Sequence, residues 1–488
     1  MTVGIDIGTT AVKALLVDAD GNVVARSRVP HRVMTPSPDF LEHDADQAWR
    51  RGPRKAFSAV TGTRSGIAAA GITAMVPSMT AVDRRGIPRS AGLLYGDRRG
   101  MSQTGGAGVQ AGMPDAEGQL RWAASTEPGA HGYWPAQAVA SQSLCGVAAI
   151  DTVTAVSFGR LHTWQGWDEE VLSGLGVEAS QMPSVLGLGA PAGRMEGSGI
   201  LVAAGTVDAL GDQIVSGAEH VGDVLVVFGA TLVMWVVTDE WIEVPGYWTV
   251  PHTVPGRVLV GGPSNAGALF HDWASSLLQR SRRQAGPAAR LAASRAPARP
   301  GPRPGPRPGQ RNGPPGDASQ GGVRRSPSSP AGALHPGRVP VWLPWVRGER
   351  VPFHDPGLSA SLHGLDISQG PEAIQRAADE AAGFVIRRLV ERSGVSARRI
   401  VASGGGTRDI AWMKAVADAS GLPVDLVAVP EGAALGAAFV ARIAAGLEEG
   451  IEGAGRWARV SSRVEPDPAY LEGVSDRYRV FRSHEPDE

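Results

Sequence analysis

The sequence predicts an α/β protein with two similar domains, and two observations indicate this fold class. Apolar strand-like runs alternate with helix-like stretches along most of the chain. A strand–turn–strand pattern also occurs twice, at Val3–Val17 and at Val224–Val237, as expected if each domain begins with a β-hairpin. The length of 488 residues agrees, because single domains usually hold about 100–200 residues.

The first hairpin has a clear local signal. The apolar runs Val3–Ile7 and Ala14–Val17 flank the turn Gly8-Thr9-Thr10. The turn Gly21-Asn22 then leads into a third strand, Val23–Arg28. Three consecutive short strands predict a sheet with an antiparallel edge.

The second half repeats this order and ends in helices. The strand VLVVF, the turn Gly229-Ala230-Thr231 and the strand LVMWVV form the second hairpin. A buried helix is expected over Pro371–Glu391, and a strand at Ile400–Ala402 runs into Ser403-Gly404-Gly405-Gly406. The next helix, Ile410–Ser420, should stop at Gly421, and the strand VDLVAV precedes a last helix after Pro430-Glu431.

One segment, residues 286–338, departs from this pattern. It holds 12 Pro, 10 Gly and 9 Arg, and Asp317 is its only acid. Proline lacks the amide proton and glycine is costly to order, so neither a helix nor a central strand is expected. A disordered insertion and an out-of-frame translation of GC-rich DNA are favoured over a basic tether for an anionic partner. We therefore expect an N-terminal domain at 1–219, a C-terminal domain at 220–445 that carries this insert, and a tail at 446–488.

Composition excludes several classes of protein. The formal net charge of −1 gives no global attraction to nucleic acid or to a membrane. The longest apolar run, Val224–Val237, is too short for a spanning helix. The single cysteine, Cys145, excludes a disulfide scaffold and suits a reducing compartment, and no signal peptide is evident, so a cytoplasmic protein is expected.

Three glycine-rich turns after apolar strands are the strongest chemical signal. They are Gly8-Thr9-Thr10, Gly229-Ala230-Thr231 and Gly404-Gly405-Gly406. Each exposes backbone amides that can bind phosphate oxygens, and together they suggest a nucleotide held between two domains. Neither a GxxxxGK[ST] loop nor a GxGxxG turn is present, so a P-loop and a dinucleotide fold are not indicated.

Three aspartates are candidates for the remaining chemistry. Asp6, inside the first strand, could order Mg²⁺ or could cap the Gly8 turn. Asp208 follows an apolar run and could be a general base or, by spacing alone, more often a helix N-cap. Asp97, in LLYGDRRG, could accept bonds from sugar hydroxyls or form a surface ion pair.

These segments resemble, in order, motifs of the FGGY carbohydrate kinases, the family of glycerol kinase, xylulokinase and gluconokinase. The matching segments are GIDIGTTAVKALLVD, LEHDADQAW, LLYGDRR, GTVDALGDQIVSGA, FGATLVMWV, WLPWVRGERVPFHDPGLSASLHGL, SGGGTRDIAWMKAVADASGLPV and PEGAALGAAFVA. The resemblance covers roughly residues 1–280 and 339–445. It implies two ribonuclease-H-like domains of the actin–hexokinase type around an interdomain cleft, with mixed sheets flanked by helices.

The resemblance implies an ATP- and Mg²⁺-dependent transfer of phosphate to a small sugar or polyol of a pentulose-like class. Asp208 would be the catalytic base, and Asp6 would order the metal. The expected nucleotide contacts are Asp6, Gly8, Thr9, Thr10, Lys13, Gly229, Ala230, Thr231, Gly404, Gly405 and Gly406. The expected substrate contacts are Val76, Pro77, Asp97 and Asp208. A homodimer is compatible with this interpretation.

The chain departs from the family pattern on the substrate side. Val76-Pro77 stands where xylulokinase-like sequences have Met-His, Ala209 follows the expected base, and Tyr95 replaces a tryptophan. These changes argue against D-xylulose itself and favour a less hydroxylated substrate. A catalytically impaired nucleotide- and sugar-binding regulator and an actin-like filament protein are the alternatives, but intact Asp6 and Asp208 favour retained chemistry.

Overall fold

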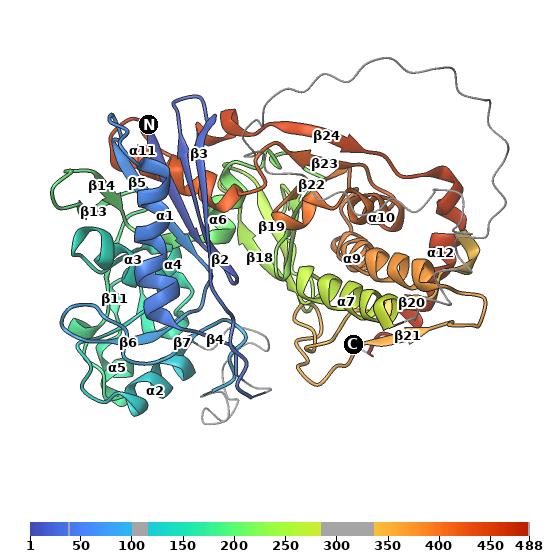
Figure 1. Cartoon of the computed structure of the whole chain (residues 1–488), viewed down its shortest axis with the longest axis horizontal. Coiled ribbons are helices and arrows are strands. Elements are labelled where there is room, and N and C mark those ends of the chain that lie inside the picture. Colours follow the sequence, from blue (N-terminus) through green and yellow to red (C-terminus); the bar gives the residue numbers. More distant parts are fainter. Residues whose placement is uncertain (38–39, 100–115, 285–335, 487–488) are drawn as a thin grey trace, which may run out of the picture.

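The computed structural model describes residues 1–37, 40–99, 116–284 and 336–486, which form two lobes side by side (Figure 1). Nearly all of the predicted insert, residues 286–335, lies outside these described residues. Within the described ranges, no helix is long and apolar enough to cross a membrane.

The N-terminal lobe is built on a mixed sheet of seven strands. Its order is β13-β14-β5-β1-β2-β3, and β15 also pairs with β5. β1, β2 and β3 are antiparallel neighbours, whereas β5 runs parallel to β1, β14 and β15. The bounds are β1 Thr2–Ile7, β2 Ala11–Val17, β3 Val23–Pro30, β5 Ala69–Ala74, β13 Pro191–Arg194, β14 Leu201–Ala203 and β15 Thr206–Val207. Every residue of β1 and β5 is buried, which agrees with their mostly apolar and small residues; Thr2, Asp6 and Thr73 are the polar exceptions.

The C-terminal lobe has a second sheet of seven strands. Its order is β18-β19-β17-β16-β22-β23-β24. The bounds are β16 Asp223–Phe228, β17 Leu232–Thr238, β18 Trp248–Pro251, β19 Val258–Ser264, β22 Arg399–Ser403, β23 Val424–Val427 and β24 Val460–Val464.

The two sheets share one topology. β19-β17-β16 is an antiparallel meander like β3-β2-β1, and β22 and β23 continue in parallel as β5 and β14 do. Each lobe therefore begins with a β-hairpin and returns to pair in parallel with its first strand. The predicted fold class, two similar α/β domains with mixed sheets, is confirmed.

Helices cover these sheets and form the rest of each core. The α-helices are α1 Gly52–Thr61, α2 Ala116–Thr126, α3 Ala136–Cys145, α4 Thr152–Val156, α5 Glu169–Gly174, α6 Asp208–Ile214, α7 Ala268–Gln284, α9 Pro371–Ser393, α10 Ile410–Ser420, α11 Gly432–Ala444 and α12 Pro468–Ser483. α10 ends at Gly421 with φ +73°, as its sequence predicts. α7, α9 and α10 lie in the C-terminal lobe (Figure 1).

The late helix α11 packs on the sheet of the other lobe (Figure 1). A Cβ atom at Gly4 of β1 would lie 1.7 Å from the Ala434 carbonyl oxygen, and one at Gly71 of β5 would lie 2.0 Å from that of Ala437. Only glycine permits this approach of helix and strand backbones. The N-terminal core is thus completed by residues more than 350 positions later in the chain.

Residues 446–486, most of the predicted tail, extend the C-terminal lobe. β24 pairs with β23, and Val474, Tyr478 and Phe481 of α12 are buried in the core. The predicted domain boundary at residue 219 falls between α6 and β16, and the boundaries stay predictions. Small two-stranded sheets complete the fold: β4 Glu42–His43 with β7 Gly92–Leu93, β6 Thr80–Val82 with β8 Gly132–Trp134, β9 Ala149–Asp151 with β12 Ser184–Leu186, β10 His162–Thr163 with β11 Gly166–Trp167, and β20 Val341–Leu343 with β21 Ser361–His363.

Candidate active site

An acid–base pair, Asp6 and Lys13, lies beside the first glycine turn. The hairpin pairs Asp6 of β1 directly opposite Lys13 of β2, so the two side chains meet. The Lys13 Nζ lies 3.2 Å from the Asp6 Oδ2. Asp6 is buried, and its negative charge raises the pKa of Lys13. A buried carboxylate therefore keeps a lysine charged next to Gly8.

Asp208 emerges at the same edge of the sheet as this turn. Thr73 of β5 is the register partner of both Asp6 and Thr206. Gly8 and Asp208 are therefore level on either side of β5, at the carboxyl ends of parallel strands where α/β sheets bind ligands.

The surroundings of Asp208 shift its proton affinity. Burial raises the pKa of Asp208 to about 6, and the nearby Asp6 carboxylate adds to the rise. The Ala209 amide, 2.7 Å from the Asp208 Oδ1, and the cations Lys13 and Arg350 act in the opposite direction. At neutral pH the group is ionised but is a stronger base than an ordinary aspartate.

Asp212, one turn further along α6, connects the two lobes. Its Oδ1 accepts a hydrogen bond of 2.6 Å from the Oγ of Ser403, the last residue of β22. Burial raises the pKa of Asp212 to about 7, and this bond opposes the rise. A Cβ at Gly432 would lie 2.1 Å from the same carboxylate oxygen, so glycine leaves room for the contact. The Gly404 turn is thereby held against the helix that begins with Asp208.

The two glycine turns of the C-terminal lobe lie side by side. β16 and β22 pair in parallel with Val227 opposite Ser403, so Gly229 and Gly404 follow neighbouring strand ends. A Cβ at Gly404 would lie 2.7 Å from the Phe228 carbonyl oxygen. Because Ser403 bonds to Asp212, the structure brings these two turns close to the carboxylates Asp208 and Asp212 at one junction between the lobes.

Arg350 reaches the N-terminal lobe from the C-terminal one. Its guanidinium carbon lies 5.3 Å from the centre of the Tyr95 ring, within the range of a cation–π contact. The Tyr95 hydroxyl lies 3.4 Å from the Thr9 Oγ1. Arg350 also lowers the pKa of Asp208, so its charge acts on the same region.

Glu349 fixes the loop that presents this arginine. The Glu349 carboxylate accepts hydrogen bonds from the Ser264 Oγ at 2.8 Å, the Asn265 amide at 2.8 Å and the Arg350 amide at 2.7 Å. Glu349 is buried, and burial raises its pKa to about 7. The position of Arg350 is thus anchored to the end of β19.

Comparison with known proteins decides what this arrangement is. The N-terminal domain of the FGGY family of carbohydrate kinases matches residues 1–104, and its C-terminal domain matches residues 224–445. This chain belongs to the FGGY family of carbohydrate kinases. It is therefore an ATP-dependent phosphotransferase with an alcohol group of a sugar or polyol as acceptor.

Relatives of known name share most of the length of this FGGY chain. It is 24% identical to the xylulose kinase of Escherichia coli K12, over 92% of this chain and 91% of that one. It is 26% identical to the glycerol kinase of Renibacterium salmoninarum, over 95% and 93%. The solved xylulose kinase of Rhodospirillum rubrum, 24% identical, superimposes with a TM-score of 0.70 over 99% of this chain and 97% of that one. The gluconate kinase of Lactobacillus acidophilus, 19% identical, gives a TM-score of 0.75 over 99% and 96%. The two structures establish the fold.

Of the four predicted substrate contacts of this FGGY kinase, Val76 and Pro77 follow a central strand, and Asp97 is already bonded to protein groups. Val76 and Pro77 follow β5, between the ends of β1 and β15. The Asp97 carboxylate accepts the Leu41 amide at 2.8 Å and the Arg99 Nη2 at 2.6 Å. Its side chain is fully buried, so it supports the loop, and a sugar contact for it stays a prediction.

Two residues at this junction, Arg350 and Ser403, had no role predicted from the sequence. Arg350 lies in the segment WLPWVRGERVPFHDPGLSASLHGL, which resembles the family, but it is one of 47 lysines and arginines, and the segment does not single it out among its own arginines. Ser403 directly precedes the Gly404 turn, and its hydrogen bond to Asp212 was not predicted from the sequence. Among the described residues, no group of three or more His, Cys, Asp or Glu could hold a metal.

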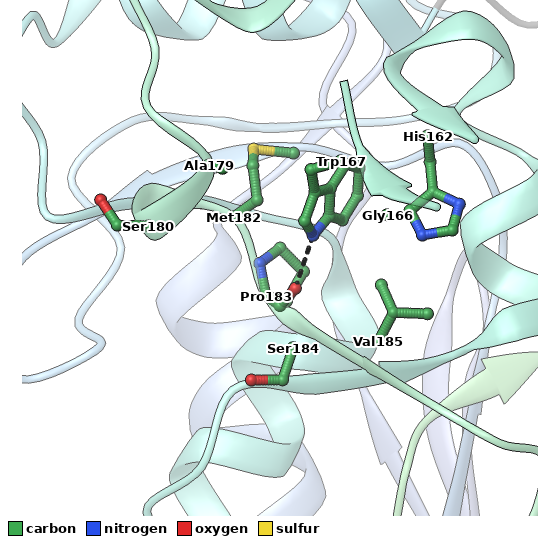
Figure 2. Close-up of a pocket in the computed structure, with 9 residues that line it drawn as sticks. All are labelled: His162, Gly166, Trp167, Ala179, Ser180, Met182, Pro183, Ser184 and Val185. Carbon is green, nitrogen blue, oxygen red and sulfur yellow. Dashed lines mark hydrogen bonds between the residues drawn. The ribbon is translucent and has the colours of Figure 1, made fainter. Parts of the chain in front are cut away.

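A separate hollow of about 360 Å³ lies in the N-terminal lobe (Figure 2). Nine residues line it: His162, Gly166, Trp167, Ala179, Ser180, Met182, Pro183, Ser184 and Val185. The Trp167 indole N–H donates a hydrogen bond of 2.9 Å to the Pro183 carbonyl oxygen. Neither carboxylates nor lysines nor arginines line it. The hollow includes none of the residues predicted to bind nucleotide or sugar.

Proposed function

We propose that this FGGY kinase transfers the γ-phosphoryl group of ATP to a hydroxyl of a small pentulose-like sugar or polyol, with Asp208 as the general base. The position of Asp208 is the observation that carries the proposal. Asp208 is level with the Gly8 turn across β5. The charges of Asp6, Lys13 and Arg350 all change its pKa.

Asp208 accepts the proton of the substrate hydroxyl as that oxygen attacks the γ-phosphorus. The new O–P bond forms while the bond from the γ-phosphorus to the bridging oxygen breaks, and ADP leaves with that electron pair. A pKa near 6 suits this role, because the carboxylate is ionised at pH 7 yet binds the incoming proton more tightly than an ordinary aspartate.

Positive charge and backbone amides would stabilise the transferring group. Lys13 lies beside the Gly8 turn, and Arg350 approaches from the facing lobe. The two C-terminal turns offer amides next to each other at parallel strand ends. Groups fixed before the reaction lower the barrier without a reorganisation cost.

The residues present fit a Mg²⁺ ion held mainly by the nucleotide. Asp6 supplies a hard oxygen ligand, and its charge raises the pKa of both Asp208 and Asp212, so a cation here would relieve repulsion. Since no larger acidic group is available among the described residues, phosphate oxygens and water would complete its shell. When bound, the ion would neutralise charge on the phosphates.

The walls of the acceptor side favour a substrate with few hydroxyls. Val76 and Pro77 offer no polar side-chain atom at the strand edge nearest Gly8 and Asp208. Tyr95 brings one hydroxyl, which already contacts Thr9. The xylulose kinase and glycerol kinase relatives support an acceptor of three to five carbons.

ADP release on a panel of pentuloses, pentitols, glycerol and gluconate tests the proposal. We expect one acceptor to give turnover that Asp208→Asn lowers by about 10²–10⁴. Undiminished turnover after this substitution would rule out Asp208 as the base. Nucleotide and sugar binding without turnover on any acceptor would instead indicate a regulator.

A further inference from the structure

Two histidines from separate segments meet behind the first glycine turn. His31 follows β3, and His43 ends β4. The His43 Nε2 lies 2.8 Å from the Thr9 carbonyl oxygen, and the His31 Nε2 lies 3.0 Å from that of Gly8. Their ring centres are 4.5 Å apart, in an edge-on arrangement. Each ring therefore contacts the carbonyl oxygen of one of two consecutive peptide groups.

Trp49 determines which nitrogen of His43 carries the proton. The Trp49 Nε1 lies 3.0 Å from the His43 Nδ1, and an indole N–H can only donate. The Nδ1 is therefore the acceptor, and the proton sits on Nε2, where it is donated to Thr9. His43 is fully buried, and burial lowers its pKa to about 4. The ring is held neutral in a single tautomer.

His31 has the same orientation for a similar reason. A carbonyl oxygen only accepts, so the His31 Nε2 must donate to Gly8. Its Nδ1 is buried and meets no partner among the described residues. Burial lowers the pKa of His31 as well.

These bonds fix the direction of two amides. In a trans peptide the C=O and the following N–H point to opposite sides. With the Gly8 and Thr9 carbonyls turned toward the histidines, the amides of Thr9 and Thr10 face away from them. Neither amide donates to an acceptor within the part of the chain that the structure describes. Both remain available to a ligand beside Lys13.

We propose that His43 and His31 are positioning residues that preset the Thr9 and Thr10 amides to bind a phosphate group of the nucleotide. This inference rests on the proposed function, since it deepens the role of the Gly8 turn. The two rings contact the carbonyl oxygens of Gly8 and Thr9 and act through that turn. They remove the need for the two peptide groups to rotate when the phosphate binds, which increases affinity through preorganisation.

Two matched amide variants test the role of His43. Glutamine places its amide near the position of Nε2, whereas asparagine reaches only that of Nδ1. His43→Gln should keep affinity for a non-hydrolysable ATP analogue with Mg²⁺ within about twofold, whereas His43→Asn should weaken it about threefold to thirtyfold. Sugar affinity should change in neither variant. His131→Asn, at an exposed histidine, is the control.

Calorimetric titration separates the outcomes. Equal affinity in His43→Asn and wild type, equal losses in both amide variants, or parallel losses of nucleotide and sugar binding would each overturn the inference while the proposed function stands. Failure of the wild type to bind the analogue would overturn the proposed function itself.

Nitrogen-15 NMR of the wild-type histidines provides a measurement without a variant. We expect the Nε2–H tautomer of His43 at pH 7. An Nδ1–H tautomer or a charged ring would contradict the inference.

Discussion

Asp208→Asn should lower turnover by orders of magnitude and at the same time stabilise the fold. Asparagine has almost the same size and can still accept the Ala209 amide, but it cannot take a proton from the acceptor. Loss of a general base typically lowers kcat by about 10²–10⁴. The gain in stability follows from the raised pKa of the carboxyl group.

The size of this gain can be worked out from the surroundings of Asp208. Burial and the Asp6 charge raise its pKa from 3.8 to about 6 in the folded state. The folded protein then binds the proton more tightly than the unfolded chain, so folding loses stability as the pH rises from 3.8 through 6. Each pH unit is worth about 1.36 kcal/mol, so ionised Asp208 destabilises the fold at pH 8 by on the order of 3 kcal/mol. Asparagine cannot ionise and avoids this loss.

Chemical denaturation at pH 8 and at pH 5 measures the effect. The free energy of unfolding of Asp208→Asn should exceed that of the wild type at pH 8, and the difference should shrink at pH 5, where the wild-type group is largely protonated. Asp20→Asn, at an exposed aspartate, should change neither value.

Two results would refute the reasoning. Equal stability of Asp208→Asn and wild type at pH 8 would mean that Asp208 is not held in a buried, negatively charged environment. A gain of the same size at both pH values would mean that packing, and not ionisation, is its source.

Three further predictions test other parts of the site. Arg350→Gln should lower kcat/KM by about tenfold to thousandfold, and Arg350→Lys should recover part of it, because the positive charge beside Tyr95 is lost in one and kept in the other. Steady-state kinetics measures the effect, and equal values for both variants and wild type would exclude a role. Ser403→Ala removes the hydrogen-bond donor to Asp212 and should raise the pKa of that carboxyl group. The free energy of unfolding should therefore fall by about 1–3 kcal/mol at pH 8 and by less at pH 5. An equal loss at both pH values would contradict this prediction. Gly4→Ala should lower the melting temperature by more than Ala→Gly changes on exposed helices do, because the new Cβ would clash with the Ala434 carbonyl oxygen. An unchanged melting temperature would show that α11 does not pack directly on the backbone of β1.

The fold class and much of the candidate site could be predicted from local patterns. Strand–turn–strand runs near Gly8 and Gly229 indicated the two hairpins, and both are present. Asp6 and Lys13 became neighbours through the pairing of adjacent strands, which a tight turn enforces. Such features depend on a few consecutive residues, so the sequence contains all the information they need.

The Asp208 segment could be singled out but not placed. Spacing alone favoured a helix N-cap, but the N-cap of α6 is Val207, and Asp208 is the first residue of the helix. Its position level with Gly8 depends on β15 pairing with β5, a contact between residues more than 130 positions apart. No local pattern specifies the register of two such distant strands.

The sequence by itself determined the α/β class, the doubled hairpin, the turns rich in glycine and the family motifs, because periodicity and turn chemistry act over a few residues. Only the tertiary structure decided that α11 packs on the first lobe, that Arg350 reaches Tyr95, and that His31 and His43 support the Gly8 turn. These contacts join segments far apart in the chain. Their formation depends on complementary packing of whole lobes, and the free energy of that packing is a property of the assembled core and not of any short stretch.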